Sequence, residues 1–137
     1  MKNHSGIVAF LAALALALSQ AAAADNFDGS KELLCAVNHA QACTPDGRCE
    51  FATADAIGLP PFIEIEFDEK QVSDTIDGDG ERTTTIERQK LTDTQLVLQG
   101  EQRLAWSIVI SRETGKMTVA ASGDGEGFVL FGACTAI

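Results

Sequence analysis

The strongest constraint on the fold is a series of short segments in which apolar and polar residues alternate. In the first, Ile63, Ile65 and Phe67 alternate with acidic residues, and this period of two indicates a strand with one face in water. Six similar segments follow, separated by short polar or glycine-containing turns, at 71–76, 82–90, 94–99, 102–111, 116–122 and 128–134. Seven such strands predict an antiparallel meander that forms a small barrel or a sandwich.

Two of these segments depart from simple alternation. Residues 128–134, FVLFGAC, are apolar at nearly every position, which predicts a strand that is buried on both faces. Residues 82–90, RTTTIERQK, are polar and rich in threonine, so we expect this strand at an edge or a rim of the sheet.

The region before the strands has a helical pattern. Asp28 or Ser30 can cap a helix, and a one-sided apolar stripe of Leu33, Leu34, Val37 and Ala40 follows. We therefore expect a short helix over about 30–41. The predicted fold class is α+β, mainly β, with this helix followed by about seven strands and with disulfides that brace the domain.

Residues 1–24 have the three parts of a secretory signal peptide. Lys2 and His4 form a short basic start, 7–18 is an apolar run, and four alanines end at Ala24. The apolar run is shorter than the roughly 20 residues that cross a bilayer. We expect cleavage near Ala24, a single mature domain at 25–137, a periplasmic or secreted location and no stable insertion into the membrane.

Four cysteines in an exported small domain predict two disulfides. The segment 44–48, TPDGR, is a strong turn and favours a Cys43–Cys49 bond, which leaves Cys35–Cys134. Pairings of Cys35 with Cys43 or Cys49 remain open. The cysteine spacings match neither a zinc site nor a C-x-x-C redox motif, and 74–81 lacks the terminal ligands of an EF-hand calcium loop. We therefore expect no metal and no cofactor.

The charge balance bears on partners. The mature chain keeps nine Lys and Arg against 20 Asp and Glu, a net charge of −11, which disfavours nucleic acid and favours a basic protein. Catalytic groups are scarce, because His39 is the only mature histidine and no nucleophile-elbow motif occurs. We assign no catalytic residue. A hydrolytic enzyme would use acidic residues around Glu64, Glu66 and Asp68.

Trp106, the lone tryptophan, is predicted to anchor the core or to form the floor of a ligand pocket inside the barrel. The leading hypothesis is a non-enzymatic binding domain for a small apolar ligand or a protein partner. The alternatives are an inhibitor of a basic secreted enzyme such as a lysozyme, and a carboxylate-dependent hydrolase.

Six short patterns follow one another along the mature chain: FDGSK-x-LLCA at 27–36, LP-x-F at 59–62, LxLQG at 96–100, WS-x-x-I at 106–110, TGK at 114–116 and GF-x-x-FGAC at 127–134. Together they resemble a family of small exported proteobacterial proteins without an assigned function. The resemblance implies export and a compact crosslinked domain, and it carries no catalytic residue.

Overall fold

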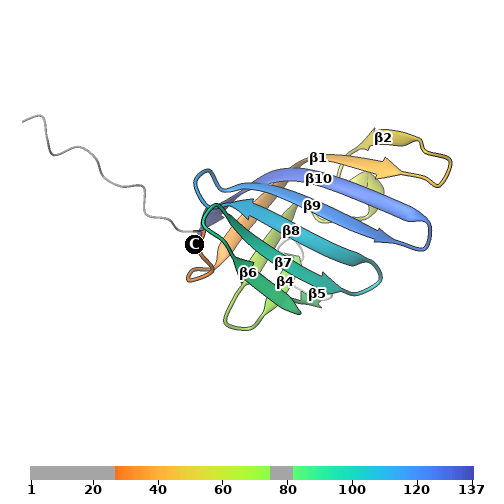
Figure 1. Ribbon diagram of the computed structural model, residues 1–137. Coiled ribbons are helices and arrows are strands. Elements are labelled where there is room, and N and C mark those ends of the chain that lie inside the picture. Colours follow the sequence, from red (N-terminus) through yellow and green to blue (C-terminus); the bar gives the residue numbers. More distant parts are fainter. Residues whose placement is uncertain (1–26, 75–81) are drawn as a thin grey trace, which may run out of the picture.

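The computed structural model describes residues 27–74 and 82–137, which form one antiparallel sheet curled into a half-barrel (Figure 1). Its ten strands are β1 Leu33–Cys43, β2 Cys49–Ala52, β3 Phe62–Glu66, β4 Gln71–Asp74, β5 Thr83–Thr85, β6 Arg88–Leu91, β7 Gln95–Glu101, β8 Ala105–Ser111, β9 Lys116–Gly123 and β10 Glu126–Ala136. They lie in the order β5-β4-β3-β1-β10-β9-β8-β7-β6, and β2 pairs with β1 beside this path. In the described ranges, no helix is long and apolar enough to cross a bilayer.

The meander that the alternation predicts is confirmed. Each of the seven expected segments contains a strand, and only 82–90 is divided, into β5 and β6. At the division, the Ile86 amide donates to the Lys70 carbonyl at 2.8 Å and the Glu87 amide donates to the Gln99 carbonyl at 2.9 Å. The segment therefore pairs first with β4 and then with β7, at opposite ends of the sheet.

The helix predicted over 30–41 is wrong. Residues 33–43 are β1, which pairs with β10 along its whole length, and the only helical element in the described ranges is one 3-10 turn, Asp55–Ile57. The pairing register of β1 shifts between Val37 and His39, so Asn38 is an extra residue in a β-bulge. Leu33 and Val37 lie before the bulge and Ala40 after it, and all three face inward.

The inner face of the curled sheet carries the core. Its buried members come from β1, β3, β4, β7, β8, β9 and the β5–β6 junction: Leu33, Cys35, Ile65, Val72, Ile86, Leu96, Leu98, Ile108, Ile110 and Met117. Alternation along each strand sends one residue in two to this face. The remaining residues of each strand point outward.

The cysteines form two disulfides, Cys35–Cys134 and Cys43–Cys49. The first joins β1 to β10 across 99 residues of sequence inside the core, and the Cys134 sulfur lies 3.8 Å from the Met117 sulfur. The second closes the hairpin between β1 and β2. This is the pairing that the turn at 44–48 favours.

The expectation that 128–134 is buried on both faces is wrong. Leu130 is buried on the inner face, but Phe131 on the outer face is 45% exposed. No described element covers the outer side of β10 (Figure 1). The strand is therefore more apolar than its surroundings require.

Candidate functional site

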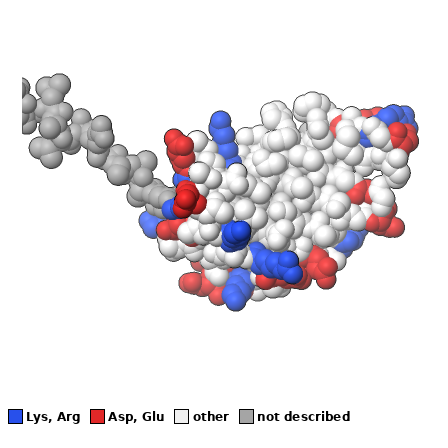
Figure 2. Space-filling view, in the orientation of Figure 1, with Lys and Arg blue, Asp and Glu red and all other residues white. Residues whose placement is uncertain are grey.

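The central strands of the sheet carry charged residues only at their ends. Apart from three terminal residues, Lys116, Glu126 and Glu101, the neighbouring strands β1, β10, β9, β8 and β7 contain no Asp, Glu, Lys or Arg. The whole chain has 30 such residues. Figure 2 shows the consequence, since charged side chains gather at the margins of the molecule and a broad uncharged area covers the strands facing the viewer. We call the outward side of these five strands the neutral face.

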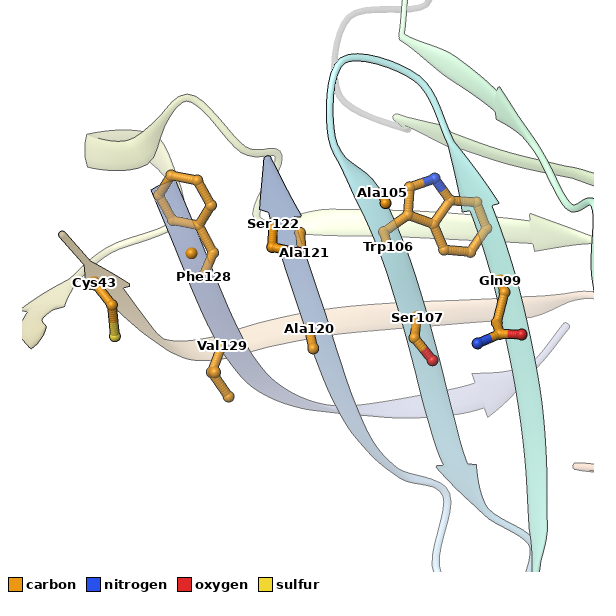
Figure 3. A pocket seen from close by; sticks show the side chains of 11 residues that line it. Cys43, Gln99, Ala105, Trp106, Ser107, Ala120, Ala121, Ser122, Phe128 and Val129 are labelled. Atoms are coloured by element: carbon orange, nitrogen blue, oxygen red, sulfur yellow. The ribbon is translucent and has the colours of Figure 1, made fainter. Parts of the chain in front are cut away.

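The outward residues of the neutral face form rows across the strands, because paired residues point to the same side. One row consists of Gln99, Ser107, Ala120, Val129 and Gln41. The next consists of Glu101 at the end of β7, followed by Ala105, Ser122, Gly127 and Cys43. These mostly small side chains line a shallow, open groove of about 450 Å³ (Figure 3). The groove runs across the strands and reaches the Cys43–Cys49 disulfide.

An aromatic patch adjoins this groove and consists of His39, Phe51 and Phe131. The rings of His39 and Phe51 meet edge to face, with centroids 6.2 Å apart, and His39 pairs with Phe131 across β1 and β10. Phe51 is 78% exposed. Gln41 connects the patch to the groove, because it pairs with Phe51 on one side and Val129 on the other.

The hairpin tip, residues 44–48, is exposed but is held by several hydrogen bonds. The Thr44 amide donates to the Arg48 carbonyl at 2.9 Å, and the Gly47 amide donates to the Thr44 carbonyl at 3.0 Å. Gly47 has φ +82°, a conformation that favours glycine. The Asp46 carboxylate accepts bonds from the Thr44 hydroxyl and from Nε of Arg48, and these bonds hold the pKa of Asp46 below its ordinary value.

Trp106 lies on the inner side of the sheet. Trp106 is among the residues that line the groove, but its ring points to the opposite side of the sheet from Ser107, Ala120 and Val129 (Figure 3). The indole N–H donates to the Thr84 hydroxyl at 3.1 Å, and the ring lies close above Gly100. Trp106 therefore links β8 to β5. Its assignment as the floor of a ligand pocket stays a prediction.

The carboxylates of the hydrolase alternative lie outside the neutral face, on β3 and in the turn that follows it. Glu64 and Glu66 point outward from β3, two positions apart. Partial burial raises the pKa of Glu66, and the charges of Glu69, Glu64 and Glu32 add to this effect. Asp68 is exposed in the turn after β3. In the described part of the chain, no group of three or more His, Cys, Asp or Glu is arranged to hold a metal ion. Residues 75–81 of the loop compared with an EF-hand, and the predicted signal peptide, lie outside the described residues.

Sequence reasoning missed the neutral face. Its signal is present as five segments with no charge in their interiors, but β1 is far from the other four in the sequence, and the segments become one surface only through the strand order. A comparison with protein-family models, curated proteins and solved structures finds no match.

Proposed function

We propose that this chain is an exported, non-enzymatic binding domain that holds a protein partner on its neutral face. The carrying observation is the absence of charge from the interiors of five neighbouring strands in a chain of net charge −10. The centres of protein interfaces are depleted in charged residues, whereas a surface with no partner is under no such constraint.

The shape of the site favours a protein over a small apolar ligand. Small-molecule sites are concave and bury most of the ligand surface. The groove on the neutral face is shallow and open, and its floor is built from residues such as Ser107 and Ala120. The inner side of the sheet carries the core cluster, with Trp106 packed against it. A broad, flat partner surface fits this arrangement better than an enclosed ligand does.

Export is part of the proposal. It is supported by the signal-peptide pattern at 1–24, by two disulfides and by the resemblance to small exported proteins. We also infer that the segment 83–91 closes the half-barrel into a small barrel, because its hydrogen bonds reach both β4 and β7.

Charge insertion tests the proposal. The double variant Ser107→Glu/Ala120→Glu places two carboxylates in the groove, and Thr85→Glu places one on the exposed residue of β5, outside the neutral face. Each protein, purified with a tag from exporting cells after chemical crosslinking, is analysed for partners at defined stoichiometry. We expect the partner of the wild type to be retained by Thr85→Glu and lost by the double variant, with unchanged unfolding midpoints.

Two results contradict the proposal. One is a wild-type protein that crosslinks to no defined protein. The other is a double variant that keeps its partner while folded normally. A change of Trp106 emission on addition of small apolar compounds, without any protein partner, favours the ligand alternative instead.

A further inference from the structure

We infer that the hairpin 43–51 is a preorganised docking element that enters an open cleft on the partner, and that this partner is a cationic secreted enzyme of the lysozyme kind. The inference rests on the proposed function and deepens it, because it names the inserted segment and the chemistry of the partner.

The first observation is that the hairpin is crosslinked although it contributes nothing to the core. All residues from 44 to 51 are exposed, and none belongs to the core cluster. The hairpin nevertheless has its own disulfide, two backbone hydrogen bonds across the turn and an Asp46–Arg48 ion pair at 2.6 Å. Pro45 also lies against Gly125 in the turn between β9 and β10. A segment that is already ordered loses little conformational entropy when it binds.

The second observation is the side chain that the hairpin presents. Phe51 has the largest exposed fraction of the large apolar side chains in the described ranges, 78%. It lies on the same side as the groove, and its ring makes an edge-to-face contact with His39. Exposed aromatic side chains on stiff supports are the typical energetic centres of interfaces, where they fill pockets of the partner. Phe51 is continuous with the neutral face through Gln41.

The third observation is the charge around the hairpin. Two cations, one in the hairpin and one in the turn before β8, are paired with carboxylates: Arg48 with Asp46 at 2.6 Å and Arg103 with Glu126 at 3.7 Å. Glu50 in β2 and Asp124 beside Gly125 have no such pair among the described residues. The free charge here is negative, as is the net charge of the chain, −10. The local negative charge and the net negative charge both attract a cationic partner, whereas they repel a second copy of this chain.

The probe for the test is lysozyme, a cationic enzyme with an open cleft, and the full chain is used after removal of its leader. We expect binding at low salt with a Kd below about 10 μM that weakens as salt is added. Phe51→Ala weakens binding by about tenfold or more. Cys43→Ala/Cys49→Ala weakens it several-fold, because the hairpin is then ordered only on binding. Phe62→Ala is the matched control, since Phe62 is also exposed, 43%, but lies on β3, and its affinity stays unchanged.

An absence of binding below about 100 μM at low salt overturns the inference, as does a Phe51→Ala variant that binds like the wild type. A second measurement needs no partner: backbone order parameters from ¹⁵N relaxation should give residues 44–51 values near about 0.85, as in the strands, and values below about 0.6 refute the preorganisation. If Ser107→Glu/Ala120→Glu loses a crosslinked partner while lysozyme is not bound, the proposed function stands and only this inference fails. If variants of the neutral face and of the hairpin both bind like the wild type, the proposed function and this inference both fail.

Discussion

The two disulfides should contribute very differently to stability, although both are intact crosslinks on β1. In the chain-entropy description, a crosslink stabilises the fold by restricting the unfolded chain, and the effect grows with the length of the loop that it closes. Cys35–Cys134 spans 99 residues and Cys43–Cys49 spans 6. These lengths correspond to about 4.7 and about 2.2 kcal/mol, a difference of about 2.5 kcal/mol.

The matched variants are Cys35→Ala/Cys134→Ala and Cys43→Ala/Cys49→Ala. Urea unfolding followed by Trp106 emission gives the free energy of unfolding and its dependence on urea, the m-value. The long crosslink should cost more when it is removed. Burial adds to its cost, since Cys35 is fully buried and its truncation leaves a space in the core. The m-value should also rise for this variant, because its unfolded chain exposes more surface, and should stay constant for the hairpin variant.

The reasoning is refuted if the hairpin variant loses as much stability as the core variant, or if the core variant keeps the m-value of the wild type. Folded domains have only about 5–15 kcal/mol of stability. A core variant that is unfolded in buffer, beside a hairpin variant that is folded, therefore agrees with the expected order.

Three further predictions concern single side chains. Gly100→Ala should destabilise the fold by about 1–3 kcal/mol in urea unfolding, since its methyl group meets the Trp106 ring. Gly127→Ala, with open space around it, should cost less than about 0.5 kcal/mol, and equal costs would contradict this account. Trp106→Phe should cost about 1 kcal/mol for the lost bond to Thr84 in addition to the smaller ring, and a cost of zero would show that the bond is not formed in solution. Because the pKa of Glu66 is raised in the folded state, the folded chain binds this proton more readily than the unfolded chain, so stability falls as pH rises from 4.5 through the raised pKa. Glu66→Gln should remove this fall, as pH-dependent urea unfolding can measure, and an NMR titration that places the Glu66 carboxyl at or below 4.5 would contradict the cause.

The meander could be predicted because its strands have regular registers, as the alternation of Ile63, Ile65 and Phe67 shows. The first strand could not, for a local reason. Inward residues of a regular strand recur every second position, but the bulge at Asn38 inserts one residue. Leu33, Val37 and Ala40 thus face inward at spacings of four and three, which is also the pattern of a helix. Only the pairing with β10 distinguishes the two.

The proposed binding surface could not be predicted, for a different reason. Sequence patterns report which residues share a face of one strand, whereas the neutral face depends on which strands are neighbours. The apolar outer side of β10, with Phe131, was visible in the sequence but was interpreted as burial. Burial by the chain itself and burial by a partner leave the same apolar pattern, and only the structure shows that no element in the described residues covers this strand (Figure 1).

The longest pairing in the sheet joins β1 to β10, strands that are close together in space and almost a hundred residues apart in the chain. The half-barrel therefore lacks its central pairing until β10 has been synthesised, and a nascent chain that ends before β10 can pair its first strand only with β2 and β3. Non-local pairings of this kind form slowly, because a long loop must close before any contact stabilises it. Such a delay leaves the β1–β10 pairing to the last stage of folding, after the whole chain has been synthesised. The Cys35–Cys134 bond can then form only when the two strands have met.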